Sequence, residues 1–237
     1  MSLFSRIYFI RIVKLKTIKA LSDYLAKPFW LVYYRFKYNN IAEANKNLWV
    51  EIDQIYGWYR GSRYDEISFI GQIKGGNWYK KITKKEVVIN SSEKHYSIKQ
   101  RYLEGKEWHE TTLFKERYAN RPRQSLKGKN INNTVRIYEE KYDSIYKSIK
   151  ENGIQPAEKG FAPIYVCIGP RGEILYTDDG NHRLAMAMVI GVKKIPVKVL
   201  KRHTEWQKIR ELAKLQNPNS FQKKVLIKHI NHPDLSS

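Results

Sequence analysis

The chain has 237 residues, of which 42% are hydrophobic, which is enough for one large domain and excludes wholesale disorder. Its 44 lysines and arginines outnumber 23 acidic residues, and the formal net charge of +21 favours nucleic acid, an anionic membrane face or a phosphorylated small molecule as partner. One cysteine, Cys167, excludes an internal disulfide and argues against a cysteine-based zinc site. These features fit a reducing cytoplasm, which is the location we predict.

Residues 1–45 are expected to form a basic helical region. Cations interrupt every apolar run well short of the roughly 20 residues that a membrane span needs, and no small-residue cleavage site follows. The apolar residues Leu3, Ile7, Ile10, Ile18, Leu21 and Leu25 fall broadly on one helical side. Such a basic amphipathic helix either packs on its own domain or a second copy, or lies on an anionic surface at the inner face of the membrane through residues 1–38.

Residues 46–130 are rich in tyrosine and tryptophan and punctuated by glycine, which favours short strands and a basic loop. The stretch 86–103 is interpreted as a hairpin with its turn at 90–92. Aromatic residues interleaved with cations at 56–64 and 77–85 could stack bases and neutralise phosphates. The core and rim of a sheet would have the same composition, so both interpretations remain open. Residues 113–133 are expected to form an exposed connector.

Residues 131–216 are expected to form an α+β unit with a mixed sheet, followed by a basic tail at 217–237. Apolar residues at three- and four-residue steps predict a helix from Thr134, as N-cap, to the stop at Asn152-Gly153. The order then continues as a buried strand, a Pro-Arg-Gly turn, a second strand, a helix from 181, a third strand and a helix from 204. His95, His229 and His232 show no metal-ligand spacing and are interpreted as surface residues.

The segment "GNHR", residues 180–183, stands where the second strand passes into the helix. A helix N-terminus leaves backbone N–H groups unpaired and carries partial positive charge, so it is suited to hold a phosphate. Gly180 would permit close approach of the backbone, and His182 and Arg183 would add donors directed at the same oxygens.

Two acids, Asp178 and Asp179, precede this glycine. They would repel a bare phosphate, but they fit the site if Mg²⁺ lies between acid and phosphate, or if one of them polarises a hydroxyl. The alternative is that Asp179 caps the helix and that His182 and Arg183 face solvent. The residues alone favour neither interpretation.

Two motifs resemble the ParB/sulfiredoxin superfamily over about residues 142–202. Gly180-Asn181-His182-Arg183 is similar to that family's phosphate-binding Gly-x-x-Arg signature, and Gly153-Ile154-Gln155-Pro156 resembles the segment beside its nucleotide. The resemblance implies a mixed sheet with helices, preceded here by a basic aromatic-rich region.

Departures from the family narrow the functional prediction. Asn181 replaces the cysteine of sulfiredoxins, and the segment after residue 202 is too short for the helix-turn-helix region of chromosome-partitioning relatives. The resemblance therefore implies the small-molecule kinase branch, with ATP or another nucleoside di- or triphosphate, Mg²⁺, and a small or carbohydrate-like acceptor. Asp179, His182 and Arg183 would be catalytic with Glu110 as a second carboxylate, and Arg202 and His203 would reach the same mouth. The alternatives are a DNA- or RNA-binding protein or nuclease, and a non-catalytic nucleotide-gated switch.

Overall fold

The structure is a computed structural model, and it describes residues 27–59, 69–80, 82–84, 92–116, 131–157, 162–177 and 179–235. The apolar stripe expected within residues 1–26, Asp178 and residues 117–130 of the expected connector lie outside the described residues.

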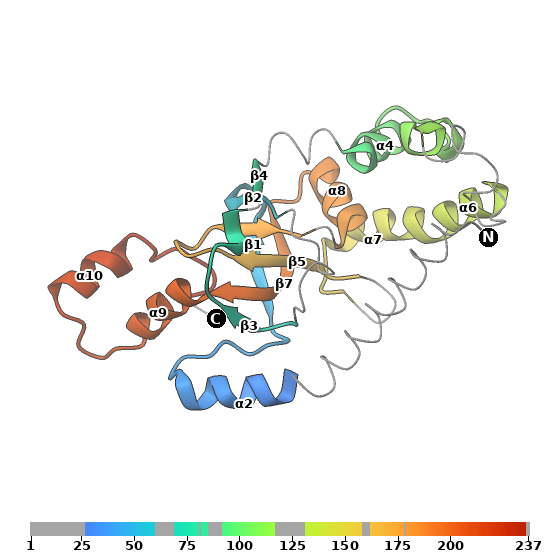
Figure 1. Ribbon diagram of the computed structural model, residues 1–237. Helices are drawn as coiled ribbons and strands as arrows, with labels where there is room; N and C mark the ends of the chain where they lie inside the picture. The colour runs from blue at the N-terminus through green and yellow to red at the C-terminus, as the bar shows by residue number, and fades with distance from the viewer. Residues whose placement is uncertain are drawn as a thin grey trace.

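The described part of the chain has an α+β fold around one mixed seven-stranded sheet (Figure 1). The strand order is β1-β7-β5-β6-β2-β4, and β3 also pairs with β7. Strand β5 runs parallel to β7 and antiparallel to β6, so the sheet is mixed at its centre. The strands are β1 (Asn47–Glu51), β2 (Ile55–Tyr59), β3 (Gln72–Lys74), β4 (Ile82–Lys84), β5 (Ile164–Ile168), β6 (Ile174–Tyr176) and β7 (Lys194–His203).

Strands from the first half of the chain extend this sheet in both directions. Strand β1 pairs antiparallel with the first half of β7, and β3 pairs parallel with its last three residues. On the other side, β2 pairs parallel with β6 and carries β4. The regions 46–130 and 131–216 therefore share one sheet rather than forming two separate ones.

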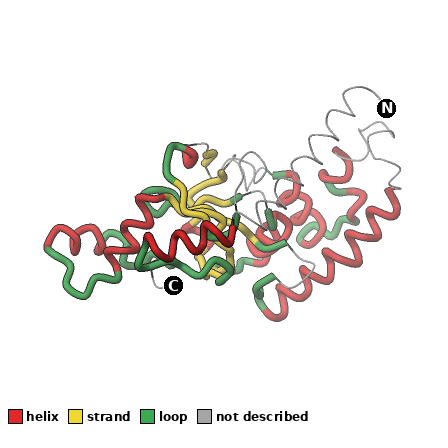
Figure 2. The backbone as a smooth tube through the Cα atoms, turned by 60° about the horizontal axis from the view of Figure 1, so that its bottom comes forward, coloured by secondary structure: helices red, strands yellow, loops and turns green. Residues whose placement is uncertain are grey.

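Helices lie at both ends of the sheet, which occupies the middle of the molecule (Figure 2). Helices α4, α6, α7 and α8 gather at one end, α9 and α10 at the other, and α2 lies beside β3 (Figure 1). The α-helices are α2 (Lys27–Lys37), α4 (Glu93–Tyr102), α5 (Thr112–Phe114), α6 (Ile131–Tyr138), α7 (Ser144–Asn152), α8 (Asn181–Ile190), α9 (Thr204–Ala213) and α10 (Ser220–Ile227). Short 3₁₀ turns are η2 (Ile52–Gln54), η3 (Trp78–Lys80) and η4 (Trp108–Glu110), and η7 (Glu139–Asp143) is a π-helical segment.

The long helix expected before the first C-terminal strand is present. Helix α6, the π segment and α7 follow one another from Ile131 to Asn152, beginning three residues before the expected cap Thr134. The helix ends where Gly153 takes a positive φ of 70°, a conformation that glycine adopts at little cost. The strands and helices expected from residue 163 to residue 213 also occur in the expected order.

The hairpin interpretation of residues 86–103 is wrong for its second strand, which is helix α4. Ser92 caps this helix by accepting a hydrogen bond from the His95 N–H. Polar side chains face inward from α4: Ser97 Oγ accepts from Leu113 N at 2.8 Å and Gln100 Oε1 accepts from Thr112 N at 2.8 Å. His95, expected at the surface, is buried as well.

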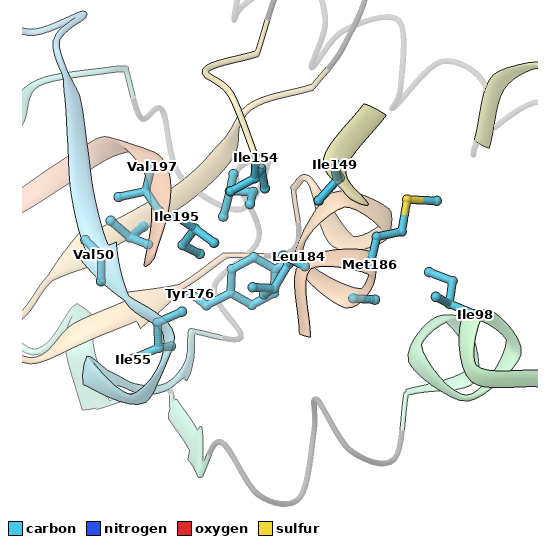
Figure 3. Packing of buried hydrophobic residues seen from close by; sticks show 14 of the residues in the cluster. Val50, Ile55, Ile98, Ile149, Ile154, Tyr176, Leu184, Met186, Ile195 and Val197 are labelled. Carbon is cyan, nitrogen blue, oxygen red and sulfur yellow. The ribbon is translucent and has the colours of Figure 1, made fainter. Parts of the chain in front are cut away.

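The main core joins the sheet to α8 and, beyond it, to α4 (Figure 3). Leu184 lies against Tyr176 of the sheet, and Met186 points toward Ile98 of α4. Strand β5 is buried along its whole length because both of its faces are covered. Cys167 points away from the main core and packs on the opposite face with Leu175 and Leu200. Burial of each large aliphatic side chain contributes about 1.5–3 kcal/mol, so this layer holds α8 firmly on the sheet.

The C-terminal segment is more than a basic tail. Asp234 is fully buried, and its carboxylate accepts hydrogen bonds from Arg202 Nε at 2.9 Å and Trp206 Nε1 at 2.9 Å. Arg210 Nη1 lies 3.1 Å from the same carboxylate. This buried ion pair ties the end of the chain to β7 and α9.

Candidate functional site

Helix α8 begins beside the first residue of β5. Gly180, its N-cap, has φ +80°, and a Cβ atom there would lie 2.8 Å from Ile164 Cα and 2.8 Å from the Pro163 carbonyl oxygen. Both the left-handed conformation and this close backbone approach require glycine. The first backbone hydrogen bond of the helix runs from Leu184 N to Gly180 O, so the N–H groups of residues 181–183 point out of the helix end.

A pocket of about 160 Å³ opens at this helix end. Three cationic side chains line it, Lys94, Lys141 and Arg183, and Asp179 is the acidic residue among its described lining. The remaining lining residues are Tyr142, Ile145, Ala162, Gly180, Asn181 and His182. The helix N-terminus adds partial positive charge, so the pocket has the electrostatics of an anion site.

Arg183 lies between this pocket and a second one. Its Nη2 atom donates a hydrogen bond to the Gln155 carbonyl oxygen, while Nη1 is buried and has no hydrogen-bond partner among the described residues. Burial lowers the pKa of Arg183, although a guanidinium remains charged near neutral pH. A half-buried cation with a spare donor favours an anionic ligand at this position.

The second pocket, of about 360 Å³, lies along α7 and the loop after it. Apart from Arg183, its lining is uncharged and consists of Ser144, Ile145, Ser148, Ile149, Gly153, Gln155, Pro156 and Ala157. Because Ile145 and Arg183 line both pockets, the basic and the uncharged pocket are neighbours.

His182 packs against the π segment rather than facing bulk water. Its ring stacks on Tyr142, with centroids 4.2 Å apart and an interplanar angle of 28°, and meets Tyr138 edge-on at 5.7 Å. The π segment thus places Tyr142 beneath His182 and Lys141 at the pocket. Single π turns of this kind are frequent at functional sites.

Asp143, the last residue of the π segment, holds that segment in place from its other side. Its carboxylate accepts hydrogen bonds from Tyr102 Oη at 2.7 Å, Trp108 Nε1 at 2.9 Å and Arg101 Nη2 at 2.8 Å. Burial and this contact with a carboxylate raise the pKa of Tyr102, which keeps its hydroxyl a donor. The position of Lys141 therefore depends on α4 and η4.

The structure brings most of the predicted site residues to these two pockets. Asp179 and residues 180–183 line the basic pocket, and Gly153, Gln155 and Pro156 line the uncharged one. Ile154 instead points into the core, where 3% of it is exposed.

Three predicted residues lie elsewhere. Glu110 is exposed and closes a capping box in η4, where its Oε2 accepts from Glu107 N at 2.9 Å. Arg202 pairs with Ile168 of β5, whereas Gly180 lies against Ile164 at the start of the same strand. The distance between Ile164 and Ile168 along the strand is about 13 Å, and it separates Arg202 from Gly180. The expectation that Arg202 reaches the pocket is therefore wrong.

His203, beside Arg202, is likewise directed away from the pocket. Its Nδ1 accepts from Glu205 N at 3.1 Å, which caps α9, and its Nε2 lies 2.9 Å from the Gly76 carbonyl oxygen. The side chains of Arg202 and His203 serve the opposite end of the sheet, where they hold the C-terminal segment and the start of α9.

Sequence reasoning missed Lys94, Lys141 and Tyr142 as site residues. Tyr142 was part of the predicted helical stripe, but a stripe of that spacing indicates core. Lys94 belongs to a segment interpreted as a strand, so its approach to α8 had no signal in the sequence.

Among the described aromatic residues considered for base stacking, some belong to the core and Tyr56 is exposed. Tyr59 and Trp78 are buried, 3% and 5% exposed, and pack edge-on with centroids 5.5 Å apart. Their neighbour Lys201 lies over both rings, at 4.6 Å from Tyr59 and 4.5 Å from Trp78. For Tyr59 and Trp78 the sheet-core interpretation is the one that holds, and the base-stacking interpretation of the other residues stays open.

The sequence predicts a Mg²⁺ ion at the basic pocket. The described residues contain no group of three or more His, Cys, Asp or Glu side chains that could form a metal cage. Magnesium with nucleotides, however, is commonly held by one or two carboxylates together with substrate phosphates. Asp179 supplies one such carboxylate at the pocket, so the residues fit a phosphate-dependent magnesium site.

Comparison of the chain with protein-family models, curated proteins and solved structures finds no significant match. The likeness to the ParB/sulfiredoxin superfamily therefore depends on the motifs and the order of elements in this chain. Across the described helices, none combines the length and the apolar character required to cross a bilayer.

Proposed function

We propose that the protein is a nucleotide-dependent phosphotransferase that phosphorylates a hydroxyl group of a small or carbohydrate-like acceptor. The observation that carries this proposal is the convergence of Lys94, Lys141 and Arg183 on the N-terminus of α8. The ParB/sulfiredoxin-like motif at Gly180–Arg183 supports it, and the small-molecule kinase branch of that superfamily offers the closest functional parallel.

The basic pocket would hold the phosphates. Phosphoryl transfer depends mainly on positioning and on neutralising the charge of the transferred group. Lysine and arginine side chains with backbone N–H groups at a helix start provide both, and the low exposure of the Arg183 guanidinium strengthens its contact with an anion.

The neighbouring uncharged pocket would hold the nucleoside. Ile145 and Ile149 offer an apolar surface for a base, while Ser144, Ser148 and Gln155 offer hydrogen-bonding groups. Arg183 lies at the junction, where the first phosphate of a nucleotide would follow the sugar.

In the proposed reaction, the acceptor oxygen attacks the terminal phosphorus and forms a new P–O bond. The bond from that phosphorus to the bridging oxygen breaks, and the nucleoside diphosphate leaves with the bond's electron pair. The hydroxyl proton passes to Asp179, the described carboxylate at the pocket. When bound by the nucleotide phosphates with Asp179 or its sequence neighbour Asp178, Mg²⁺ would neutralise further charge.

The test begins with thermal shifts of the full chain in ATP, ADP, CTP and GTP, with and without Mg²⁺. A ligand that binds the native state raises the unfolding temperature, and Arg183→Ala should abolish this rise. Lys147→Ala is the matched control, because Lys147 lies on α7, pairs with Glu151 and lines neither pocket. Absence of any nucleotide-dependent shift in the wild-type protein overturns the proposal.

A second measurement separates catalysis from gating. The nucleotide that binds is supplied with a labelled terminal phosphate, together with a panel of sugars and small alcohols, and transfer is followed by chromatography. Labelled acceptor, or labelled inorganic phosphate from water, supports the phosphotransferase. Nucleotide binding with no turnover instead supports the non-catalytic switch.

A further inference from the structure

Helix α2 carries an apolar stripe that faces away from the protein. Phe29, Val32, Tyr33 and Phe36 are three or four residues apart across successive turns, as 29/32/36 and 29/33/36, and they are 67%, 52%, 40% and 88% exposed. This spacing places them on one side of the helix. Helix α2 lies at the rim of the molecule, so its outer side borders no other described element (Figure 1).

The opposite side of α2 packs on the rest of the protein. Tyr34 is buried with Phe69 and Ile73, and its hydroxyl donates to the Ile73 carbonyl oxygen at 2.9 Å. After the helix, Asn40 Nδ2 donates to the Arg210 carbonyl oxygen at 2.7 Å. These contacts fix the rotation of α2, so the exposed stripe is a second apolar face rather than a core face turned outward.

Arg35 and Lys37 flank this stripe, whereas Lys27, seven residues before the buried Tyr34, lies on the inner side of the helix. Helix α2 contains Lys27, Arg35 and Lys37 and no acidic residue, and Lys37 Nζ lies 5.3 Å from the centre of the Tyr33 ring. The segment that precedes it in the sequence carries five further cations, at positions 6, 11, 14, 16 and 19, and one acid, Asp23. An occupant of this face must therefore match both apolar side chains and positive charge.

We propose that this face of α2 is a peripheral docking surface for an anionic phospholipid bilayer. Phe29, Val32 and Phe36 would enter the boundary between headgroups and acyl chains. Tyr33 and Trp30 belong to the residue types that favour this interface, because an apolar ring carries a polar group at its edge. Arg35 and Lys37 would contact lipid phosphates.

A bilayer fits these features better than a nucleic acid or a protein does. Nucleic acid would be matched by the cations and by stacking on the aromatic rings, but not by Val32, whose side chain offers neither charge, hydrogen bonds nor a stacking face. Among the described residues, nothing marks a protein partner of complementary shape. The inference does not depend on nucleotide binding, since α2 lines neither pocket.

The test is co-sedimentation of the full chain with vesicles of phosphatidylcholine and phosphatidylglycerol, compared with phosphatidylcholine alone. We expect binding to the anionic vesicles that weakens with salt. Phe29→Ser combined with Phe36→Ser should reduce the partition coefficient roughly 10-fold or more, because the variant loses two aromatic rings that the bilayer would bury. Arg35→Gln with Lys37→Gln should also reduce binding and flatten its salt dependence.

The matched control is Tyr96→Ser with Leu103→Ser, which removes two exposed apolar side chains from α4, at the other end of the molecule. Circular dichroism should show all variants folded, since every replaced side chain is exposed. Failure of the wild-type chain to bind anionic vesicles overturns the proposal, as does equal binding by the Phe29/Phe36 variant. A third result would also overturn it: the wild-type chain self-associates in gel filtration, the Phe29/Phe36 variant does not, and neither binds vesicles. That result would make the face a contact between copies of the chain.

Discussion

The guanidinium group of Arg183 donates a hydrogen bond to the backbone carbonyl oxygen of Gln155, and this contact joins the first turn of α8 to the loop after α7. Arg183 and Gln155 are 28 positions apart in the sequence. Arg183 consequently borders both pockets, the basic one at the helix start and the uncharged one along α7. A ligand with a charged and an uncharged part, such as a nucleotide, would span this junction.

Replacing Arg183 tests whether the fork of its guanidinium matters or only its charge. Arg183→Lys keeps the charge but carries all its donors on one nitrogen instead of the two separated Nη atoms, so nucleotide affinity should fall roughly 10-fold, and Arg183→Ala should lower it further. Isothermal titration calorimetry with the nucleotide identified by thermal shift measures both. Equal affinity of wild type and Arg183→Lys would contradict a bridging role.

Lys94 and Lys141 reach the basic pocket from α4 and from the π segment. Each replacement by alanine should weaken nucleotide binding roughly 10- to 150-fold, because a charge-assisted contact contributes about 1.5–3 kcal/mol. The double variant should also show a shallower dependence of affinity on salt, since fewer charges act on the ligand. Lys147→Ala, on the same long helix but outside the pocket, should leave both quantities unchanged.

Asp179 has two candidate roles that predict different results. If it accepts the hydroxyl proton, Asp179→Asn should abolish phosphate transfer while nucleotide affinity with Mg²⁺ stays near the wild-type value. If it holds Mg²⁺, the same variant should lose the increase in affinity that Mg²⁺ provides. Titrations with and without Mg²⁺, together with a transfer assay, distinguish the two. A variant that is normal in all three measurements would remove Asp179 from the site.

Gly180 and Gly191 offer a matched pair at the two ends of α8. Both are left-handed, with φ +80° and +86°, but an added Cβ at Gly180 meets the backbone of Ile164, whereas at Gly191 nothing lies within 4 Å. Gly191→Ala should cost about 1–2 kcal/mol of unfolding free energy for the conformation alone. Gly180→Ala should cost clearly more and should weaken nucleotide binding, because the helix start must shift. If both variants lose the same unfolding free energy in urea, the space beside β5 does not restrict the residue at position 180.

Asp234 should make the stability of the protein dependent on acid pH. Burial alone would raise the pKa of this carboxyl group, but the guanidinium groups of Arg202 and Arg210 hold it below its usual value of 3.8. Because the folded pKa is the lower one, its contribution to stability is fully present above the unfolded pKa. That contribution is lost as pH falls below 3.8 and through the folded pKa.

Asp234→Asn should therefore lower the free energy of unfolding by about 3–5 kcal/mol at neutral pH, because two buried guanidinium groups lose their partner. The deficit should shrink in acid, and urea unfolding across the pH range measures it. Glu205→Gln, which removes an exposed pair with Lys208, should cost at most about 1 kcal/mol. Parallel pH profiles for wild type and Asp234→Asn would contradict the assignment.

Local patterns predicted the elements from residue 131 to residue 213 because each carries its own signal. The long helix has apolar residues at helical spacing and a glycine stop, and β5 is a short apolar run bounded by proline and glycine. The junction at Gly180 was also visible as a strand-to-helix turn, although the residues alone did not decide between a phosphate site and a helix cap. These are properties of neighbouring residues, which hydropathy and capping rules describe well.

The sequence by itself thus determined the C-terminal order of strands and helices, the turn at Gly180 and the basic character of the surface. Only the tertiary structure decided that α4 is a helix, because its inward face is largely polar and depends on the hydrogen bonds that Gln100 and Ser97 accept from the backbone N–H groups of Thr112 and Leu113. It also decided that Lys94 and Lys141 complete the basic pocket, while Arg202 is neutralised by Asp234. Such pairings join residues far apart in the chain, and no local period records them.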